Sequence, residues 1–268
     1  MFTLLLSLML AFKAKDATDT ALLEALSEVD DGVRIDAVEE IGRRGLLAEQ
    51  DAVAALARDD PEAAVRRAAM ASLEEMSAPN LLGVCEFMLT TDVDEKNRGK
   101  CMAWIEKKGP DTGSAAMVHA AASDPSPKLR RKAIIIIGKR GWLDGAEVVM
   151  AATSDPDAGV QLEAWRAVVR LGNLEQRAHA HALLADASGD VKLRKGILKA
   201  IGDNPLPQDY ALLLGLLDDD NDDLAILSAR ALSTLGDPEA APLLREKALH
   251  REGKVAEEFN AAASTLGG

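Results

Sequence analysis

Aromatic residues are scarce in this chain: Trp, Tyr and Phe together make up 3% of its 268 residues. Because strand-rich proteins rely on aromatic and β-branched side chains, this scarcity argues against an all-β fold. Apolar residues nevertheless account for 48% of the sequence, which is too large a share for a disordered chain. Alanine and leucine carry much of that share, and both favour helices. The composition therefore predicts an all-α protein.

Positive charge is also in short supply. The chain has 31 Lys and Arg against 44 Asp and Glu, which gives a formal net charge of −13. A protein that coats nucleic acid without specificity is basic overall, because it must neutralise phosphates. The charge balance therefore argues against that class of protein.

Cysteine is rare as well. Cys85 and Cys101 are the two in the sequence, too few for a disulfide scaffold, and their spacing matches no zinc pattern. We expect both thiols to be free and buried, where cysteine acts as a small apolar side chain. A single disulfide is the alternative if the chain is exported, since disulfides persist in oxidising compartments.

Motifs of catalysis are missing. The sequence contains no G-x-S-x-G, no Walker loop and no glycine-rich dinucleotide motif after a strand. His179 and His181 are two residues apart, so on a helix they face different ways, whereas a metal-binding pair needs a spacing of three or four. We expect these two, with His119 and His250, to be solvated helix residues. The chain is thus expected to hold no metal and no cofactor.

Residues 2–12 form the apolar run FTLLLSLMLAF. It is too short to span a bilayer but has the length of the apolar region of a signal peptide. Against a signal peptide, Lys13 and Lys15 follow the run and no clean cleavage site is present. The alternative is a capping helix, although a cap should keep a polar face. We treat 1–20 as a separate segment and expect export or membrane association, with a cytoplasmic location as the alternative; removal of residues 1–17 stays open.

A short pattern recurs through the rest of the chain. It consists of a turn, Val or Leu, usually Arg, apolar residues at helical spacing and then Gly. Its first positions lie 31 to 33 residues apart, at Val33, Val65, Asn97, Leu129, Val160, Leu193, Leu224 and Val255. So constant a period over eight units indicates a repeat architecture.

The aligned columns define a helix pair in each unit. Four residues after the first position the side chain is mostly small, and eight residues after it is mostly a larger aliphatic one, so both lie on one helix face. Six of the eight units have Gly twelve residues on, which is typical of a helix C-terminus. Asp stands five residues before the first position at Asp60, Asp92, Asp124, Asp155 and Asp219. Three of these Asp precede Pro, which ends the preceding helix.

Each unit therefore consists of a helix A, an Asp-containing turn and a helix B. A helix pair of this size cannot bury its apolar face alone, so neighbouring pairs must stack. The sequence predicts an all-α fold, an α-solenoid built as a superhelical stack of about eight helix pairs over residues 21–268. A closed bundle is less compatible with this period.

The units resemble HEAT repeats, in the short form of phycobilisome-lyase-type proteins. The residues that carry the resemblance are DDPEAAVRRAAMASLEEM at 59–76, SDPSPKLRRKAIIIIGKRG at 123–141 and SDPDAGVQLEAWRAVVRLG at 154–172. The resemblance implies a scaffold fold that serves many purposes. Nothing beyond the repeats supports bilin transfer. A HEAT-like lysine hydroxylase uses His-Glu dipeptides as iron ligands, and this sequence has none.

The resemblance also implies a ladder in which the turn Asp pairs with the second residue of helix B, an Arg. The arginines at that position are Arg34, Arg66, Arg98, Arg130 and Arg194. Gln161, Ala225 and Ala256 depart from the pattern. We therefore expect an incomplete ladder in repeats 5, 7 and 8.

Charge is segregated along the chain. The helix B stretches of repeats 3 to 6 together carry +14, so the remainder carries −27. The resemblance places helix B on the concave side, which predicts a basic stripe there. Its expected residues are Lys100, Trp104, Arg131, Lys132, Trp165, Arg166, Arg170, Lys195 and Lys199. The alternative is ordinary solvated helix faces with both tryptophans in the core.

Two functions from different classes follow. The first is a non-enzymatic, monomeric scaffold or adaptor that binds a protein or peptide on the concave face, and an acidic segment would suit the stripe. The second is nucleic-acid binding or a HEAT-like DNA-base-excision enzyme, for which Glu163 is the one obvious carboxylate. The net charge of −13 weighs against the second, because repulsion slows the approach of DNA.

Overall fold

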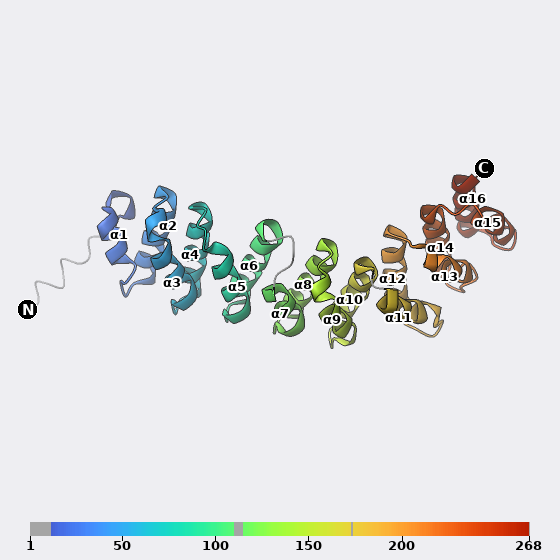
Figure 1. Ribbon diagram of the computed structural model, residues 1–268, viewed down its shortest axis with the longest axis horizontal. Coiled ribbons are helices and arrows are strands. Elements are labelled where there is room, and N and C mark those ends of the chain that lie inside the picture. Colours follow the sequence, from blue (N-terminus) through green and yellow to red (C-terminus); the bar gives the residue numbers. More distant parts are fainter. Residues whose placement is uncertain (1–11, 110–114, 173, 268) are drawn as a thin grey trace, which may run out of the picture. The chain divides into compact units, whose positions relative to one another are not determined.

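The computed structural model describes residues 12–109, 115–172 and 174–267. Within these ranges the protein has sixteen α-helices, a few short 3-10 turns and no strand. Helices that follow one another in the chain form stacked pairs, so the fold is the predicted α-solenoid (Figure 1). None of the described helices combines the length and the apolarity needed to cross a membrane. The apolar run at 2–12 lies outside the described residues, except for Phe12.

The chain divides into two compact units, Met1–Ala120 and Ala121–Gly268. In the first unit the helix pairs are α1 with α2, α3 with α4, and α5 with α6. Their bounds are Asp19–Ala25, Asp31–Arg44, Gln50–Asp59, Ala63–Glu75, Leu81–Thr91 and Glu95–Lys108, and α7 (Ala115–Ser123) begins in this unit. Helix α1 starts at Asp19, and the division of the chain at residue 20 stays a prediction.

In the second unit the even-numbered helices are the B helices. They are α8 (Pro127–Arg140), α10 (Ala158–Leu171), α12 (Val191–Asp203), α14 (Asp222–Leu235) and α16 (Gly253–Gly267). The A helices are α9 (Ala146–Ala151), α11 (Leu174–Ala185), α13 (Tyr210–Leu216) and α15 (Ala240–Ala248). Within this unit the A and B helices form two layers (Figure 1), and each B helix packs against the next.

Both predicted core columns are fully buried. The mostly small residues four positions into each repeat, from Ala37 to Phe259, have no exposed surface. The aliphatic residues four positions later, from Ile41 to Ala263, have none either. A face built from Ala, Ile, Leu and Val lets helices approach closely, which explains why the core needs few aromatic rings.

The glycine stop works as predicted in four repeats. Gly45, Gly141, Gly172 and Gly236 end their helices in the left-handed conformation, with φ between 64° and 80°, which glycine adopts without steric cost. Gly109 differs, because its φ is −69°. Glycine suits that position for a different reason: a Cβ there would lie 2.5 Å from the Ile105 carbonyl oxygen.

A ladder of buried Arg–Asp pairs fastens neighbouring repeats. In the first step, Arg34 Nε and Nη2 donate to the two carboxylate oxygens of Asp60 over 2.8 and 3.0 Å. The same pairing joins Arg66 to Asp92, Arg130 to Asp155 and Arg194 to Asp219. Each arginine thus reaches the turn of the following repeat. The predicted ladder is confirmed at these four steps.

Two of the predicted departures are compensated locally. In repeat 5, Gln161 Nε2 donates to the Asp155 carbonyl at 2.6 Å, as the ladder arginines do to the carbonyls of their own turns. In repeat 7, Arg251 of the next repeat donates to the Leu217 and Asp219 carbonyls, both at 2.9 Å. Gln161 carries no charge, however, so among the described residues no ladder ion pair joins repeats 5 and 6.

Candidate binding surface

One face of each B helix carries the positions three, six and ten residues after the first position, and in the second unit most of their residues are exposed or half-buried, Gly196 being buried. Residues at this spacing share a face of an α-helix. In repeats 5, 6 and 7 they are Glu163, Arg166 and Arg170 on α10, Gly196, Lys199 and Asp203 on α12, and Leu227, Arg230 and Thr234 on α14. We call this surface of the second unit the helix B face.

A cavity of about 340 Å³ opens on the helix B face across α10, α12 and α14. Its cations are Arg166, Arg170, Lys199 and Arg230. The first three are residues of the predicted stripe, and all four line this one cavity. Arg230 lies one repeat beyond the charge-segregated stretch of repeats 3 to 6, so the charge sum does not reveal it, whereas the repeat period places it beside Lys199.

Two of these four cations are held by carboxylates. Arg166 Nη1 donates to Glu163 at 2.7 Å, one helical turn away. Arg230 forms a two-pronged ion pair with Glu258 of α16, and this contact raises the pKa of the arginine and lowers the pKa of the glutamate. Both guanidinium groups therefore have a fixed place on the surface.

The other two cations have no such partner. Arg170 is half-buried and Lys199 is exposed, and within the described residues neither makes a hydrogen bond or an ion pair. The remaining polar groups of the cavity are the exposed Asp203 and Thr234. Unpaired cations beside fixed arginines favour the binding of an anion, since charge-assisted hydrogen bonds are the stronger ones.

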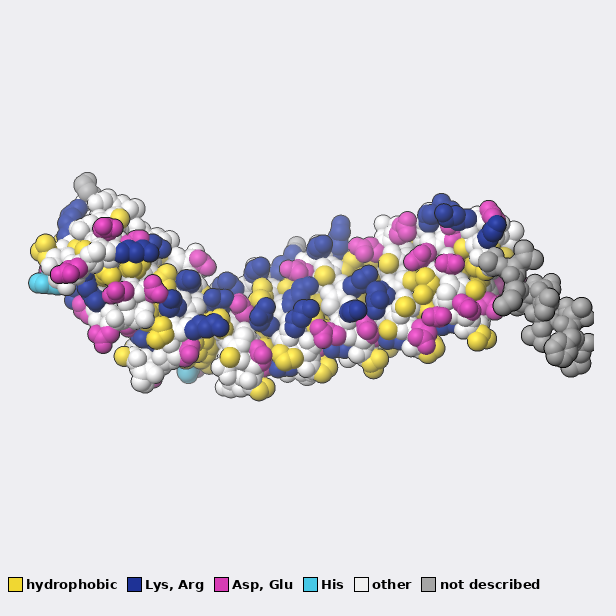
Figure 2. Space-filling view, turned by 180° about the vertical axis from the view of Figure 1, so that it is seen from behind, with side chains coloured by type: hydrophobic (Ala, Val, Ile, Leu, Met, Phe, Trp, Pro, Cys, Tyr) yellow, Lys and Arg dark blue, Asp and Glu magenta, His cyan; other side chains and the backbone are white. Residues whose placement is uncertain are grey.

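Four cations of the predicted stripe lie outside the cavity, three of them in the second unit. Lys195 forms an ion pair with Asp223, which lowers the pKa of that carboxyl. Arg131 is exposed on α8, and Lys132 is half-buried beside it. In Figure 2 the Lys and Arg side chains do not form one uninterrupted patch, because apolar and acidic side chains lie between them.

Trp165 lies in the core, which was the alternative to a place on the predicted stripe. Its ring is 8% exposed and belongs to the core of the second unit, where a large apolar side chain gains most from burial. Trp104 is half-buried on α6 of the first unit, on the same helix as the exposed Lys100. Of the two tryptophans, Trp104 is therefore the one with a partly exposed side chain.

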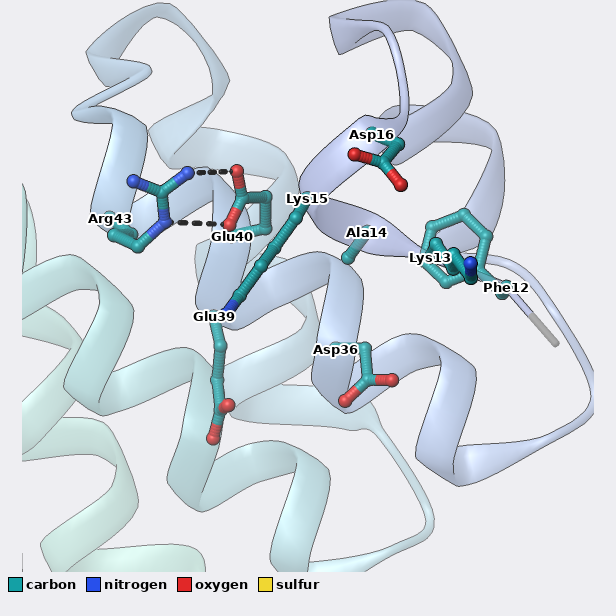
Figure 3. A pocket seen from close by; sticks show the side chains of 9 residues that line it. All are labelled: Phe12, Lys13, Ala14, Lys15, Asp16, Asp36, Glu39, Glu40 and Arg43. Atoms are coloured by element: carbon teal, nitrogen blue, oxygen red, sulfur yellow. Dashed lines mark hydrogen bonds and ion pairs between the residues drawn. The ribbon is translucent and has the colours of Figure 1, made fainter.

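The first unit carries a second cavity, of about 410 Å³, where α2 exposes the equivalent positions. These positions hold Asp36, Glu39 and Arg43, so they are mainly acidic. Figure 3 shows Arg43 paired with Glu40 at one side of the cavity, with Lys13 and Phe12 at the other. Hydrogen bonds from Arg43 and Arg44 lower the pKa of the buried Glu40 to about 2. The positive helix B face is thus a property of particular repeats.

A buried cluster in the second unit was not predicted. Arg177 is fully buried and donates to both oxygens of the fully buried Asp209, while its Nη1 donates to the Val169 carbonyl at 2.9 Å. His181 Nε2 lies 2.7 Å from Asp209 Oδ1, with 22% of its side chain exposed. His181 is therefore a partner of a buried carboxylate, and the expectation of a fully solvated histidine is wrong for it.

This cluster is structural. Burial raises the pKa of Asp209, but hydrogen bonds from His181, Arg177 and the Leu206 amide outweigh it and hold that pKa at about 2. Every polar atom of the carboxylate has a donor, so none is left to act on a substrate. The sequence signal was weak, because Arg177 and Asp209 are 32 residues apart in different repeats.

The described residues hold no group of three His, Cys, Asp or Glu that could bind a metal ion. Cys85 and Cys101 are free and fully buried, as expected. Cys101 Sγ lies 3.9 Å from Met88 Sδ, and the contact with Cys101 together with burial raises the pKa of the Cys85 thiol. A buried thiol with a raised pKa is a poor nucleophile.

Comparison with known families finds a match to HEAT repeats over residues 114–191. Among solved structures, YibA from Escherichia coli is 18% identical, covers 94% of this chain and 93% of its own, and has a TM-score of 0.53. This likeness shows the fold alone. No curated protein matches the chain.

Two further structures resemble the chain more loosely. The complex of CpcE and CpcF of phycocyanin lyase from Nostoc sp. PCC7120 is 16% identical, with 96% and 98% of the two chains covered and a TM-score of 0.39. A designed armadillo repeat protein in complex with the peptide (KR)4 is 14% identical, with 93% and 100% covered and a TM-score of 0.33.

Proposed function

We propose that this chain, which is a HEAT-like repeat protein, is a non-enzymatic scaffold that binds an acidic segment of a partner protein on the helix B face. The observation that carries the proposal is the cavity in which unpaired Arg170 and Lys199 lie beside the anchored Arg166 and Arg230. A repeat solenoid is compatible with a protein-binding scaffold, because stacked helices present an extended surface.

Several features support binding over catalysis. Glu163, the one carboxylate suggested for base excision, is engaged with Arg166 at 2.7 Å. Trp165 is buried and offers no ring to a flipped base. The acidic Asp203 lies at the cavity as well, and the net charge of −13 repels polyanions at long range. A short acidic peptide carries far less charge than DNA and is repelled less.

The test is the affinity for a fluorescent oligo-glutamate peptide, measured by anisotropy across salt concentrations. Electrostatic binding should weaken as salt rises, because counterions screen exposed charges. Reversal of the two unpaired cations, R170E with K199E, should abolish binding. The matched control is R245E with K96E, which makes the same change in net charge at two exposed positions outside the cavity.

Two outcomes would contradict the proposal. One is equal loss of affinity in the cavity variant and the control variant, which would attribute binding to net charge. The other is tighter binding of a single-stranded or duplex oligonucleotide than of the peptide at the same salt concentration, which would favour the nucleic-acid alternative. Circular dichroism of both variants checks that the helices are intact.

A further inference from the structure

The cavity on the helix B face collects its cations from three helices. Arg166 and Arg170 come from successive turns of α10, Lys199 from α12 and Arg230 from α14. A carboxylate is planar and is satisfied by one arginine fork, as the two-pronged pair of Arg230 with Glu258 illustrates. Donors that approach from three helices suit a group whose acceptor oxygens point in several directions.

The charge of the cavity suits a dianion. Arg170 and Lys199 are unpaired and together supply two positive charges, and a phosphorylated serine carries about −1.5 to −2 at pH 7. Arg166 uses Nη1 for Glu163 and Nε for a long contact of 3.4 Å to the Gly196 carbonyl, so its Nη2 stays available as a donor. Asp203 opposes the anion, but its side chain lies exposed at the cavity.

Three of the residues that line the cavity are small, namely Ala200 and Gly202 of α12 and Ala231 of α14. The other apolar lining residues are Leu198 and Leu227. The volume of about 340 Å³ leaves room for the residues that flank the anion as well. A long side chain at any of the three positions would occupy this space.

From this geometry we infer that the cavity binds a phosphate group carried on a serine or threonine of the partner segment. The inference rests on the proposed function, because it specifies the group by which an acidic segment is anchored. The phosphate would lie between Arg170 and Lys199, with the free N–H groups of Arg166 and Arg230 completing its coordination. Arg clusters recognise phosphorylated segments through such charge-assisted hydrogen bonds.

The position of the cavity adds a second consequence. Arg170 is in repeat 5 and Lys199 is in repeat 6, and between these repeats the ladder ion pair is missing because Gln161 replaces the arginine. A phosphate held by both residues would connect α10 to α12 at this junction. Binding should therefore raise the thermal unfolding midpoint of the protein, as any ligand that binds only the folded state does.

The experiment compares three peptides that differ at one position, Glu-Glu-Gly-X-Gly-Glu-Glu, where X is phosphoserine, serine or glutamate. We expect the phosphoserine peptide to bind roughly tenfold more tightly than the serine peptide and several-fold more tightly than the glutamate peptide. R170Q and K199Q should each reduce the preference for phosphoserine over serine to less than about twofold. R245Q, on the outer helix α15, should leave the preference unchanged.

The outcomes separate this inference from the proposed function. Equal affinity for all three peptides would overturn the phosphate site and leave the acidic-segment scaffold standing, whereas no binding of any peptide would overturn both. Should R170Q or K199Q fail to fold, competition on the unaltered protein decides. Inorganic phosphate in excess should displace the phosphoserine peptide more effectively than acetate does at the same ionic strength. Equal displacement by phosphate and acetate would overturn the phosphate site.

Discussion

The arginine at the second position of helix B is buried because it satisfies two sets of acceptors at once. Arg66 binds both carboxylate oxygens of Asp92 in the next repeat, and its Nη1 donates to the Asp60 and Pro61 carbonyls of its own turn. Asp92 in turn accepts from the Asp94 amide and from Asn97. Removing one partner would leave the other charge buried, which costs more than the pair contributes.

Replacement of Arg66 by methionine should therefore be strongly destabilising. We expect R66M to lower the free energy of unfolding of the first unit by about 3–5 kcal/mol, because the Asp92 carboxylate stays buried and loses the guanidinium group with which it pairs. Urea denaturation followed by circular dichroism measures this. The control is K247M, which removes the exposed pair with Asp218 and should cost less than about 1 kcal/mol. Similar losses in both variants would contradict the prediction.

The buried Asp209 predicts a pH dependence of stability. Its pKa is about 2 in the folded protein and about 3.9 when unfolded. Since the folded value is the lower one, its contribution of about 2–3 kcal/mol is fully present above pH 4 and is lost as the pH falls toward 2. D209N should flatten the stability profile between pH 5 and pH 2, while D220N, at an exposed aspartate, should leave its slope unchanged.

At the scale of the helices, close packing of B helices depends on small residues that face each other. A Cβ on Gly138 of α8 would lie 2.8 Å from the Cβ of Ala167 on α10. A Cβ on Gly202 of α12 would lie 3.6 Å from the Cβ of Ala231 on α14, which is an ordinary contact. Two glycines in the same column of the repeat therefore have different tolerances.

This difference gives a paired prediction with opposite signs. G138A should destabilise the protein by about 1–3 kcal/mol, because the added methyl must displace a neighbouring helix. G202A should stabilise it by about 0.5–1 kcal/mol, because alanine favours the helix and has room there. Thermal unfolding of the two variants measures both effects, and a shift of the same sign in both would show that the spacing of the helices is not as described.

The elements themselves could be predicted from the sequence, because period and core columns are properties of one helix face. What lies between elements was harder to predict. The turn of repeat 6 is longer, so that Asp186 stands seven residues before Leu193, where its Oδ1 accepts from the Ser188 amide and hydroxyl. The other turn aspartates stand five residues before the first position of their repeat, so a search at that spacing does not find Asp186.

At the scale of the whole chain, the core and the surface differ in how much the sequence reveals. Burial repeats with the period, so the core residues follow from it. Outside the ladder, contacts between charges on the surface do not repeat: Lys199 is unpaired, whereas Lys195 on the same helix is bound to Asp223, 28 residues away. Trp165 has the residue type of a ligand-binding side chain but the place of a core residue. The residue type alone cannot distinguish a paired lysine from an unpaired one, or a core tryptophan from a ligand-binding one.

The cysteines test the integrity of the first unit. Cys85 and Cys101 have no exposed surface, so an aromatic disulfide reagent should modify neither at an appreciable rate in the native protein. In urea it should release two equivalents of chromophore. Rapid modification of the native protein would contradict the described packing of α5 against α6, whereas slow modification at a rate that follows the urea concentration would report the opening of this unit.

The ladder has a consequence for how such a gene can grow or shrink. Because each ladder arginine binds the aspartate of the following repeat, a repeat such as the second contributes the acceptor Asp60 to its predecessor and the donor Arg66 to its successor. Duplication or loss of one full period preserves this balance wherever the crossover falls. Insertion or deletion of a segment of any other length would separate a ladder guanidinium from its carboxylate and leave one of the two buried without its partner. Selection against unpaired buried charge would thus help to keep the length of the repeat constant while its outer face diversifies.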